Sequence, residues 1–126
     1  MMIARTGIDL IEVARFEKQA PEIRERFIER VYTIAERAYC GDNSQHLAGR
    51  FACKEAVSKA LGVGIGKVGW QEIEILNDDN GRPRLFLHGE AAAEAERQGL
   101  RQWSVSITHV KAMAAASVVA LGEVDE

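Results

Sequence analysis

The sequence predicts an α+β fold in which an antiparallel sheet packs against helices, one of them long and central. Three patterns predict it: helical spacing of apolar residues over Ser44–Leu61, an Asn80-Gly81 hairpin signal, and alternation of apolar and polar residues over Trp103–His109. Strands of this antiparallel type mixed with helices are typical of the α+β class. The 126 residues, 47% of them hydrophobic, are expected to form one domain over residues 1–126.

The N-terminal part is expected to start with a strand. A short apolar run over Ile3–Ile11 predicts it. Helical spacing follows over Glu12–Val31, where Pro21 is expected to separate two helices because proline cannot donate a backbone hydrogen bond. Thr33 and Glu36 have the spacing of a capping box and therefore predict the start of a further short helix.

The longest helix is expected over Ser44–Leu61. A polar turn over residues 41–44 precedes it and offers N-capping side chains. Gly62 follows the last apolar position, where glycine commonly ends a helix. This helix should be the central one, since its apolar stripe is the longest in the chain.

The C-terminal half is expected to be rich in strands. Alternation over Gln71–Leu76 predicts one strand, and Leu85–Leu87 would return after the hairpin turn. An alanine- and glutamate-rich helix is expected over Gly89–Gln98. The segment Ala112–Leu121 stays open. Its alanines favour a helix, its valines favour a strand, and an antiparallel return from the strand over Trp103–His109 would suit it.

Charge and hydropathy exclude several classes of protein. The net charge of −3 argues against a general nucleic-acid-coating role, which requires a basic surplus. No window approaches the roughly 18 apolar residues that a membrane span needs, and the N-terminus does not resemble a signal peptide. Cys40 and Cys53 lack the spacing of a metal or redox pair, so they are expected to be free thiols in a reducing cytoplasm.

Two carboxylates stand out because each lies in or beside an apolar run. Asp9 interrupts the first strand, and a buried carboxylate is costly unless it is paired or binds a cation. Glu55 lies at the edge of the apolar stripe, with Lys59 one turn later. Ordinary explanations remain open for both: a helix cap or ion pair for Asp9, and an exposed Glu55–Lys59 pair on the helix surface.

Four strings surround or follow these carboxylates in order along the chain. They are Gly7–Phe16 (GIDLIEVARF), Gly49–Ala60 (GRFACKEAVSKA), Asn80–Pro83 (NGRP) and Val105–His109 (VSITH). With these strings at these separations, the chain closely resembles the holo-[acyl-carrier-protein] synthase family of phosphopantetheinyl transferases. The likeness reaches from the first strand to about Leu121. It implies the 4′-phosphopantetheinyl transferase-like fold.

The resemblance implies a reaction. The 4′-phosphopantetheine arm of coenzyme A moves to a serine hydroxyl of apo acyl carrier protein, for fatty acid biosynthesis, and adenosine 3′,5′-bisphosphate leaves. By the resemblance, Asp9 and Glu55 are the Mg²⁺ ligands, and Mg²⁺ suits a diphosphate because it binds carboxylate and phosphate oxygens. Glu55, or a water that it orients, would take the serine proton, and the sequence leaves both roles open.

The resemblance also implies contacts with coenzyme A. Lys59 becomes a phosphate contact and a group that neutralises or protonates the leaving bisphosphate, so that Asp9, Glu55 and Lys59 form the catalytic set. A solvated helix lysine is the alternative for Lys59. The other implied contacts with coenzyme A are Ser106, Thr108, His109, Arg82 and Pro83. A plain hairpin turn explains Arg82 and Pro83 equally well.

A docking surface for the acidic carrier protein should gather arginines. On one continuous helix, Arg15, Arg26 and Arg30 would lie within roughly a third of a turn of one another, although Pro21 weakens that geometry. The resemblance places these first helices against the carrier protein, with Arg50 and Phe51 nearby. Interspersed glutamates leave a mixed solvated surface as the alternative.

Some conspicuous residues receive no role. Lys54 belongs to the second string, but its helix position points it away from Glu55, so its role stays open. His46 and His88 have no partner pattern and are expected to be surface or core residues. The glycine-rich run over residues 62–67 lacks the GKS or GKT ending of a phosphate loop.

Three hypotheses follow. The first is the transferase, for which the resemblance implies a cytoplasmic homotrimer with active sites between subunits. The second is a non-catalytic module of the same fold that binds coenzyme A or the carrier protein. The third, a metal-dependent phosphohydrolase, would need more acidic ligands than the sequence offers. Asp9, Glu55 and Lys59 together favour the first, because a binding module needs no metal pair beside a lysine.

Overall fold

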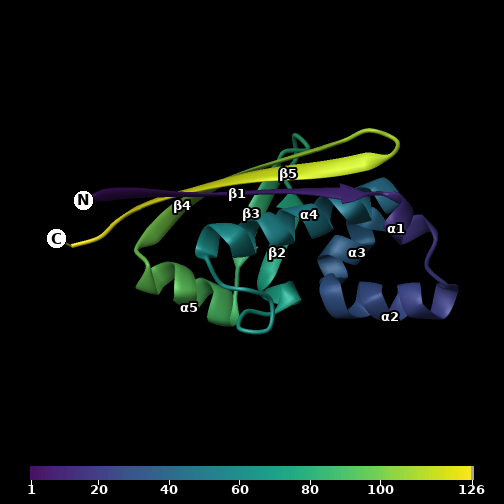
Figure 1. Ribbon diagram of the computed structural model, residues 1–126, viewed down its shortest axis with the longest axis horizontal. Coiled ribbons are helices and arrows are strands. Elements are labelled where there is room, and N and C mark those ends of the chain that lie inside the picture. The colour runs from purple at the N-terminus through teal and green to yellow at the C-terminus, as the bar shows by residue number, and fades with distance from the viewer. Residues whose placement is uncertain (126) are drawn as a thin grey trace.

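The computed structural model describes residues 1–125 and shows a three-stranded antiparallel sheet lying over helices (Figure 1). The strands lie in the order β1 (Met2–Glu12), β5 (Met113–Glu123) and β4 (Leu100–His109). The α+β prediction is therefore confirmed. No helix within these residues is long and apolar enough to cross a membrane.

The ambiguous C-terminal segment is a strand. It pairs with β1 along its whole length, from Met2 opposite Glu123 to Glu12 opposite Met113, and with β4 on its other side. Its small residues Ala114 and Ala116 alternate into the core. This burial outweighs the helix propensity of alanine, because β-structure depends on packing more than on intrinsic preference.

The central helix α4 (Ser44–Leu61) lies beneath the sheet and has the predicted bounds. The Asn43 side chain accepts a hydrogen bond from the backbone N–H of His46 at 2.9 Å and so caps the N-terminus. Gly62 ends the helix in the left-handed conformation, with φ of 73°. Most residues of α4 between these caps are buried, so the helix forms the centre of the core.

Pro21 separates two helices, as predicted. The helix α1 (Ala14–Glu17) is only one turn, and α2 (Pro21–Val31) starts at the proline itself. The expected helix start at Glu12 is wrong, because Glu12 still pairs with β5 as part of β1. The predicted capping box is present at the start of α3 (Ile34–Cys40): the Thr33 hydroxyl and the Glu36 carboxylate exchange hydrogen bonds with each other's backbone.

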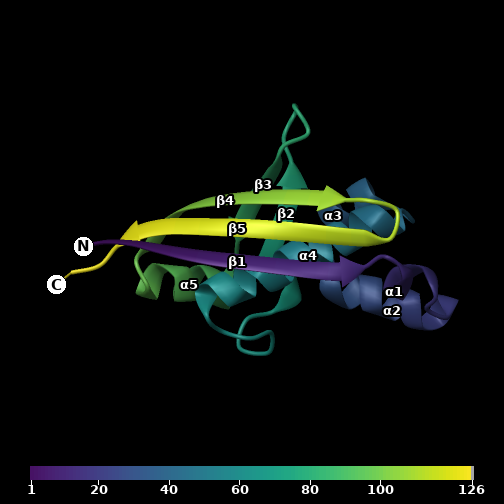
Figure 2. The ribbon, with the colours of Figure 1, turned by 45° about the horizontal axis from the view of Figure 1, so that its top comes forward.

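A second, two-stranded sheet is the hairpin of β2 (Ile73–Asn77) and β3 (Pro83–Leu87). Figure 2 shows its tip projecting past β4. The Asp78 carboxylate closes the turn by accepting from the backbone N–H groups of Asn80 and Arg82. The residues before β2 form a short 3₁₀ helix, η1 (Trp70–Glu72), rather than the expected strand start, and α5 (Gly89–Arg97) follows the hairpin.

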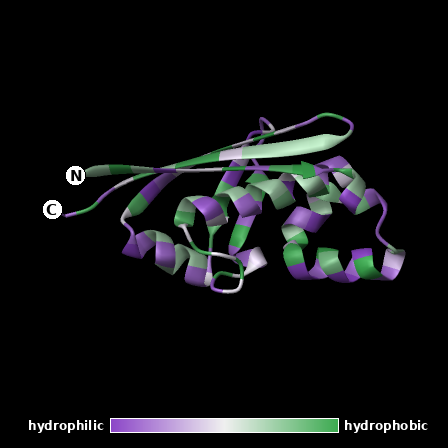
Figure 3. Cartoon of the chain, viewed as in Figure 1, coloured by the Kyte–Doolittle hydropathy of each residue, from purple (hydrophilic) through white to green (hydrophobic). Residues whose placement is uncertain are grey.

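The core lies between the sheet and the helices. Figure 3 shows β5 as hydrophobic along most of its length, whereas α2 alternates between hydrophilic and hydrophobic residues. Phe16, Phe51 and Trp70 belong to an aromatic cluster with ring centroids 4.9–5.8 Å apart. Cys40 and Cys53 are free and buried, and burial raises the pKa of Cys40 to about 11, so its thiol stays protonated.

Candidate active site

The structure brings Asp9 and Glu55 together where β1 crosses α4. Asp9 alternates with Gly7 and Ile11 on the strand face that is turned toward the helix, and both carboxylates are half-buried. Burial, and then the neighbouring Asp9 carboxylate, raise the pKa of Glu55, whereas Lys59 and Arg15 pull that pKa down. Two acidic groups and two basic groups therefore act on one another at this partly buried site.

Lys59 is the third member of this cluster. Its ammonium Nζ lies 3.2 Å from Asp9 Oδ1 and donates to the backbone oxygen of Ile8 at 2.9 Å. The Lys59 side chain is 55% exposed, so it stays accessible to a ligand while it is held at the β1 edge. The alternative drawn from the sequence, an exposed Lys59 that pairs only with Glu55, does not include this contact with β1.

Close contact between the two backbones holds the cluster together. Gly7, two residues before Asp9, lies against Ala56, the residue after Glu55. A Cβ at Gly7 would lie 2.7 Å from the carbonyl carbon of Ala56, closer than real side chains approach. Only glycine therefore lets β1 come this near to α4 beside the two carboxylates.

A second group of polar residues lines a pocket of about 180 Å³ between α4, the hairpin and the end of β4. It contains His109, Arg50, His46 and Pro83, and no acidic side chain lines it. The rings of His46 and His109 are 6.1 Å apart, and the pKa of His46 is lowered by burial and then by Arg50 and His109. We call this site the basic pocket.

Arg50 is the residue that sequence reasoning misplaced. It was expected on the docking surface, but it is only 4% exposed: it donates to Asn77 and lies over the Tyr39 ring at 4.1 Å. Its Nε is buried without a hydrogen-bond partner. Phe51 is likewise 7% exposed because it packs in the aromatic cluster. Neither side chain offers a free surface to a partner.

His46 was expected to be a plain surface or core residue, and it joins the basic pocket instead. No spacing in the sequence indicates this, since α4, the hairpin and β4 meet only in the fold. An arginine within an otherwise apolar stretch of helix is the one available signal, because buried arginines are uncommon without a partner.

The residues of the β4 string do not converge. His109 faces the basic pocket, whereas Ser106 and Thr108 lie exposed on the opposite, outward face of the sheet. Ser106 lines a groove of about 710 Å³ together with Arg82 and Pro83. It also lines a groove of about 660 Å³ with Lys59. Ser106 therefore lines both grooves, as do its neighbours Ser104 and Val105.

We call Asp9, Glu55 and Lys59 the Asp9 cluster. Within one chain this cluster and the basic pocket lie apart. Asp9 is opposite Ala116 on β5, which in turn is opposite Ile107 on β4. Asp9 and Ile107, which lines the basic pocket, are therefore two strand spacings apart, about 10 Å.

The remaining docking candidates are exposed. Arg15 lies on α1, with its guanidinium 5.7 Å from the centre of the Phe51 ring, and Arg26 and Arg30 lie one turn apart on α2. The break at Pro21 places Arg15 on a different helix from the other two. Whether the three arginines lie on one face therefore depends on how α1 and α2 pack, and helix periodicity does not decide it.

The donor set fits a cation that is completed by a substrate. Residues 1–125 hold no group of three or more metal-ligating side chains. Asp9 and Glu55 provide two carboxylates, and Mg²⁺ commonly takes one or two carboxylates and completes its shell with phosphate and water.

The fold and this site agree with comparisons with known proteins. Residues 5–114 match the family model of the 4′-phosphopantetheinyl transferase superfamily. Because the match spans most of the chain, the chain belongs to this superfamily.

Within the superfamily, the chain is similar to holo-[acyl-carrier-protein] synthases. It is 46% identical over 124 residues to that of Herpetosiphon aurantiacus, covering 93% of this chain and 98% of the relative. It is 47% identical to that of Moorella thermoacetica, covering 87% and 88%. The structure is similar to that of the Helicobacter pylori holo-[acyl-carrier-protein] synthase in complex with coenzyme A, with a TM-score of 0.82, 34% identity and coverage of 91% and 98%.

Proposed function

We propose that this chain is a holo-[acyl-carrier-protein] synthase. It transfers the 4′-phosphopantetheine arm of coenzyme A to a serine hydroxyl of apo acyl carrier protein and releases adenosine 3′,5′-bisphosphate. The names of its relatives and the coenzyme A bound to the Helicobacter pylori protein support this reaction. The observation that carries the proposal is the meeting of Asp9, Glu55 and Lys59 where β1 crosses α4.

Asp9 and Glu55 would hold Mg²⁺. The raised pKa of Glu55 supports this: burial and then the neighbouring Asp9 carboxylate disfavour its negative charge, which a cation between the two carboxylates would offset. When bound, Mg²⁺ would neutralise the diphosphate of coenzyme A and fix its geometry.

The chain's own side chains supply the rest of the chemistry. The carboxylate of Glu55, or a water that it orients, accepts the proton of the serine hydroxyl. The serine oxygen bonds to the phosphorus that carries the pantetheine arm while the bond from that phosphorus to the bridging oxygen breaks. Lys59 stabilises the negative charge that the leaving bisphosphate gains.

The basic pocket would hold a phosphate of coenzyme A. Arg50 carries a buried Nε without a partner, and His109 and His46 lie beside it. A phosphate in the pocket would pair with the positive charge of the Arg50 guanidinium. Pro83 borders both the pocket and the adjoining groove on the hairpin side, and Arg82 lines that groove. Ser106 and Thr108 would contact the nucleotide from the outward face.

The carrier protein would dock on α1 and α2. Arg15, Arg26 and Arg30 are exposed there, and an acidic partner is complementary to them. The Asp9 cluster lies next to α1, since Arg15 is close enough to lower the pKa of Glu55. A serine presented at this surface would therefore reach the carboxylates.

The proposed assembly is a homotrimer. Its support is the outward face of the sheet, where large apolar residues are exposed: Ile8 69%, Leu10 64%, Leu121 39% and Val119 37%. No helix within residues 1–125 covers this face (Figure 1), and contiguous exposed apolar surface marks an interaction site. Packing copies through it would also place Ser106 and Thr108 of one copy near another. The proposed location is the cytoplasm, which fits two unpaired cysteines.

The test is the mass of apo acyl carrier protein after incubation with the enzyme, coenzyme A and Mg²⁺. We expect the mass gain of one phosphopantetheine arm, which EDTA prevents. Asp9→Ala and Glu55→Gln should lose most activity, whereas Glu96→Gln, an exposed change on α5, should not. Full activity of both site variants would remove the metal assignment. Binding of coenzyme A without any mass gain would favour a non-catalytic binding module.

A further inference from the structure

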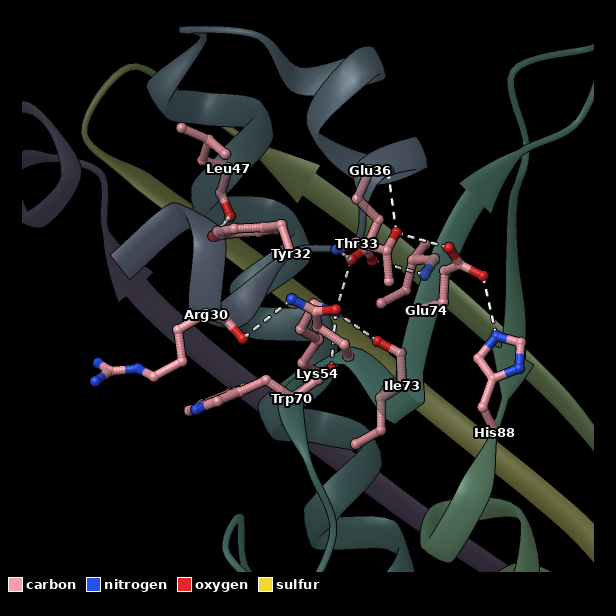
Figure 4. A network of polar contacts seen from close by, with 12 residues as sticks. Arg30, Tyr32, Thr33, Glu36, Leu47, Lys54, Trp70, Ile73, Glu74 and His88 are labelled. Carbon is pink, nitrogen blue, oxygen red and sulfur yellow. Dashed lines mark hydrogen bonds and ion pairs between the residues drawn. The ribbon is translucent and has the colours of Figure 1, made fainter. Parts of the chain in front are cut away.

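Lys54 is a fully buried cation whose three donors are all used. Figure 4 shows it between α3, η1 and the start of β2. Its Nζ donates to Glu36 Oε1 at 2.8 Å, to the Trp70 carbonyl at 3.0 Å and to the Ile73 carbonyl at 2.5 Å. Both side chains of the Glu36–Lys54 pair are 0% exposed. An ammonium has three N–H groups, so no donor is left for a substrate.

Glu36 extends the same network into the hairpin. Its Oε2 accepts from the backbone N–H of Ile75 at 2.8 Å, and its Oε1 accepts from that of Thr33 at 2.9 Å. One ion pair therefore joins α4 to α3, to η1 and to the first strand of the hairpin. We call these contacts the Lys54 anchor.

The anchor lies between the two groups of site residues on α4. Glu55, which follows Lys54, is turned by about 100° around the helix and faces β1. Arg50 lies four residues earlier, on nearly the same face as Lys54, and donates to Asn77 at the end of β2. A rotation of α4 about its axis would therefore move Glu55 away from Asp9 and Arg50 away from the basic pocket together.

We propose that the buried Glu36–Lys54 pair positions α4 against the β2–β3 hairpin, so that Glu55 meets Asp9 while Arg50 lines the basic pocket. Lys54 is a positioning residue, since it touches neither carboxylate of the site. Stability alone is a weak reason for such a pair, because apolar replacements of buried ion pairs are often neutral or stabilising. The proposal rests on the proposed function, which assigns the carboxylates to catalysis and the pocket to coenzyme A.

The first test is the double variant Glu36→Leu/Lys54→Met, which removes the pair without leaving a lone buried charge. For the folded variant we expect kcat to fall about tenfold and KM for coenzyme A to rise about fivefold, as misplaced groups in a site produce. KM for the carrier protein should not change, because Arg15, Arg26 and Arg30 lie outside the anchor. A smaller folded fraction alone would lower kcat and leave both KM values unchanged.

The matched control is Glu94→Leu/Lys67→Met, which makes the same substitutions in a pair with 3.5 Å separation on another part of the fold. It should leave both KM values and kcat as in the wild type. A folded Glu36→Leu/Lys54→Met enzyme with wild-type KM for coenzyme A would overturn the proposal. If the wild-type protein transferred no phosphopantetheine arm, this result would instead overturn the proposed function.

The double variant leaves backbone groups of the anchor unpaired and could therefore fail to fold. In that case Lys54→Arg decides the question. Arginine keeps the charge, but its planar fork cannot direct its N–H groups to the same three acceptors. We expect the same rise in KM for coenzyme A with an unchanged KM for the carrier protein. Wild-type kinetics of Lys54→Arg would show that the three directed contacts of Nζ do not set the position of α4 and would overturn the proposal.

Discussion

The close contact of β1 and α4 at Gly7 leads to a quantitative prediction for Gly7→Ala. The new Cβ would lie 2.7 Å from the carbonyl carbon of Ala56, and ordinary contact starts at 3.4 Å. The obstacle is helix backbone, which cannot rotate away as a side chain can. Strand and helix must therefore separate by about 1 Å, beside the two residues that carry the site.

Two consequences have known magnitudes. Overpacking of a core costs typically about 1–3 kcal/mol, which a domain with a stability of about 5–15 kcal/mol survives. A misplacement of 1 Å in a catalytic site can reduce activity about 100-fold. We expect Gly7→Ala to remain folded, to lose about 3 kcal/mol of unfolding free energy and to lose about 100-fold in kcat/KM.

Denaturant unfolding and a transfer assay on the folded protein measure both quantities. Gly122→Ala is the matched control for stability: its Cβ would lie 2.7 Å from the carbonyl carbon of Gly99, at the other end of the sheet. It should lose similar stability but retain the activity per folded molecule. Gly64→Ala, where no atom lies within 4 Å of the new Cβ, should change neither.

Two results would contradict a role of Gly7 in placing the site. One is a Gly7→Ala enzyme with wild-type stability and wild-type kcat/KM, which would mean that the helix does not need this contact. The other is an equal loss of activity in Gly122→Ala, which would mean that any weakening of the sheet inactivates the enzyme.

Three further predictions concern charge and assembly. The folded state binds the Glu55 proton more tightly than the unfolded state, because its pKa is raised; the resulting stabilisation is present at low pH and lost as pH rises through the folded pKa. Without metal, Glu55→Gln should therefore raise the free energy of unfolding at pH 7.5 by less than about 1 kcal/mol, given its partial exposure to solvent, with a correspondingly higher Tm, and should have no such effect near pH 4; a lower Tm at pH 7.5 would contradict this. Arg15→Glu and Arg26→Glu should raise KM for the carrier protein and flatten its salt dependence, and an unchanged KM would count against the docking surface. Ile8→Lys, a charge in the outward apolar face, should give a monomer in sedimentation analysis, and a trimer would argue against that interface.

Local sequence signals predicted much of the fold. Pro21, the Thr33–Glu36 capping box and the Asn80-Gly81 turn act within a few residues, so the structure shows each of them where the sequence indicates it. The helix over Ser44–Leu61 was equally clear, since capping and apolar spacing agree on its bounds. The segment over Ala112–Leu121 was not, because local propensity and burial favour different structures there.

The sequence predicted those site residues that belong to a motif on a single strand or helix. Asp9, Glu55 and Lys59 were identified from their strings, and the fold brings them together. Arg50 and His46 were missed because their pocket forms from three elements distant in sequence. The partner of Lys54 could not be inferred either, since Glu36 already had a local explanation as a capping residue.

Anomalous scattering from Mn²⁺, used in place of Mg²⁺ in crystals grown with coenzyme A, would locate the metal directly. We expect one peak between the carboxylates of Asp9 and Glu55, in contact with the diphosphate. A diphosphate bound far from both carboxylates, or a metal peak that touches neither of them, would contradict it.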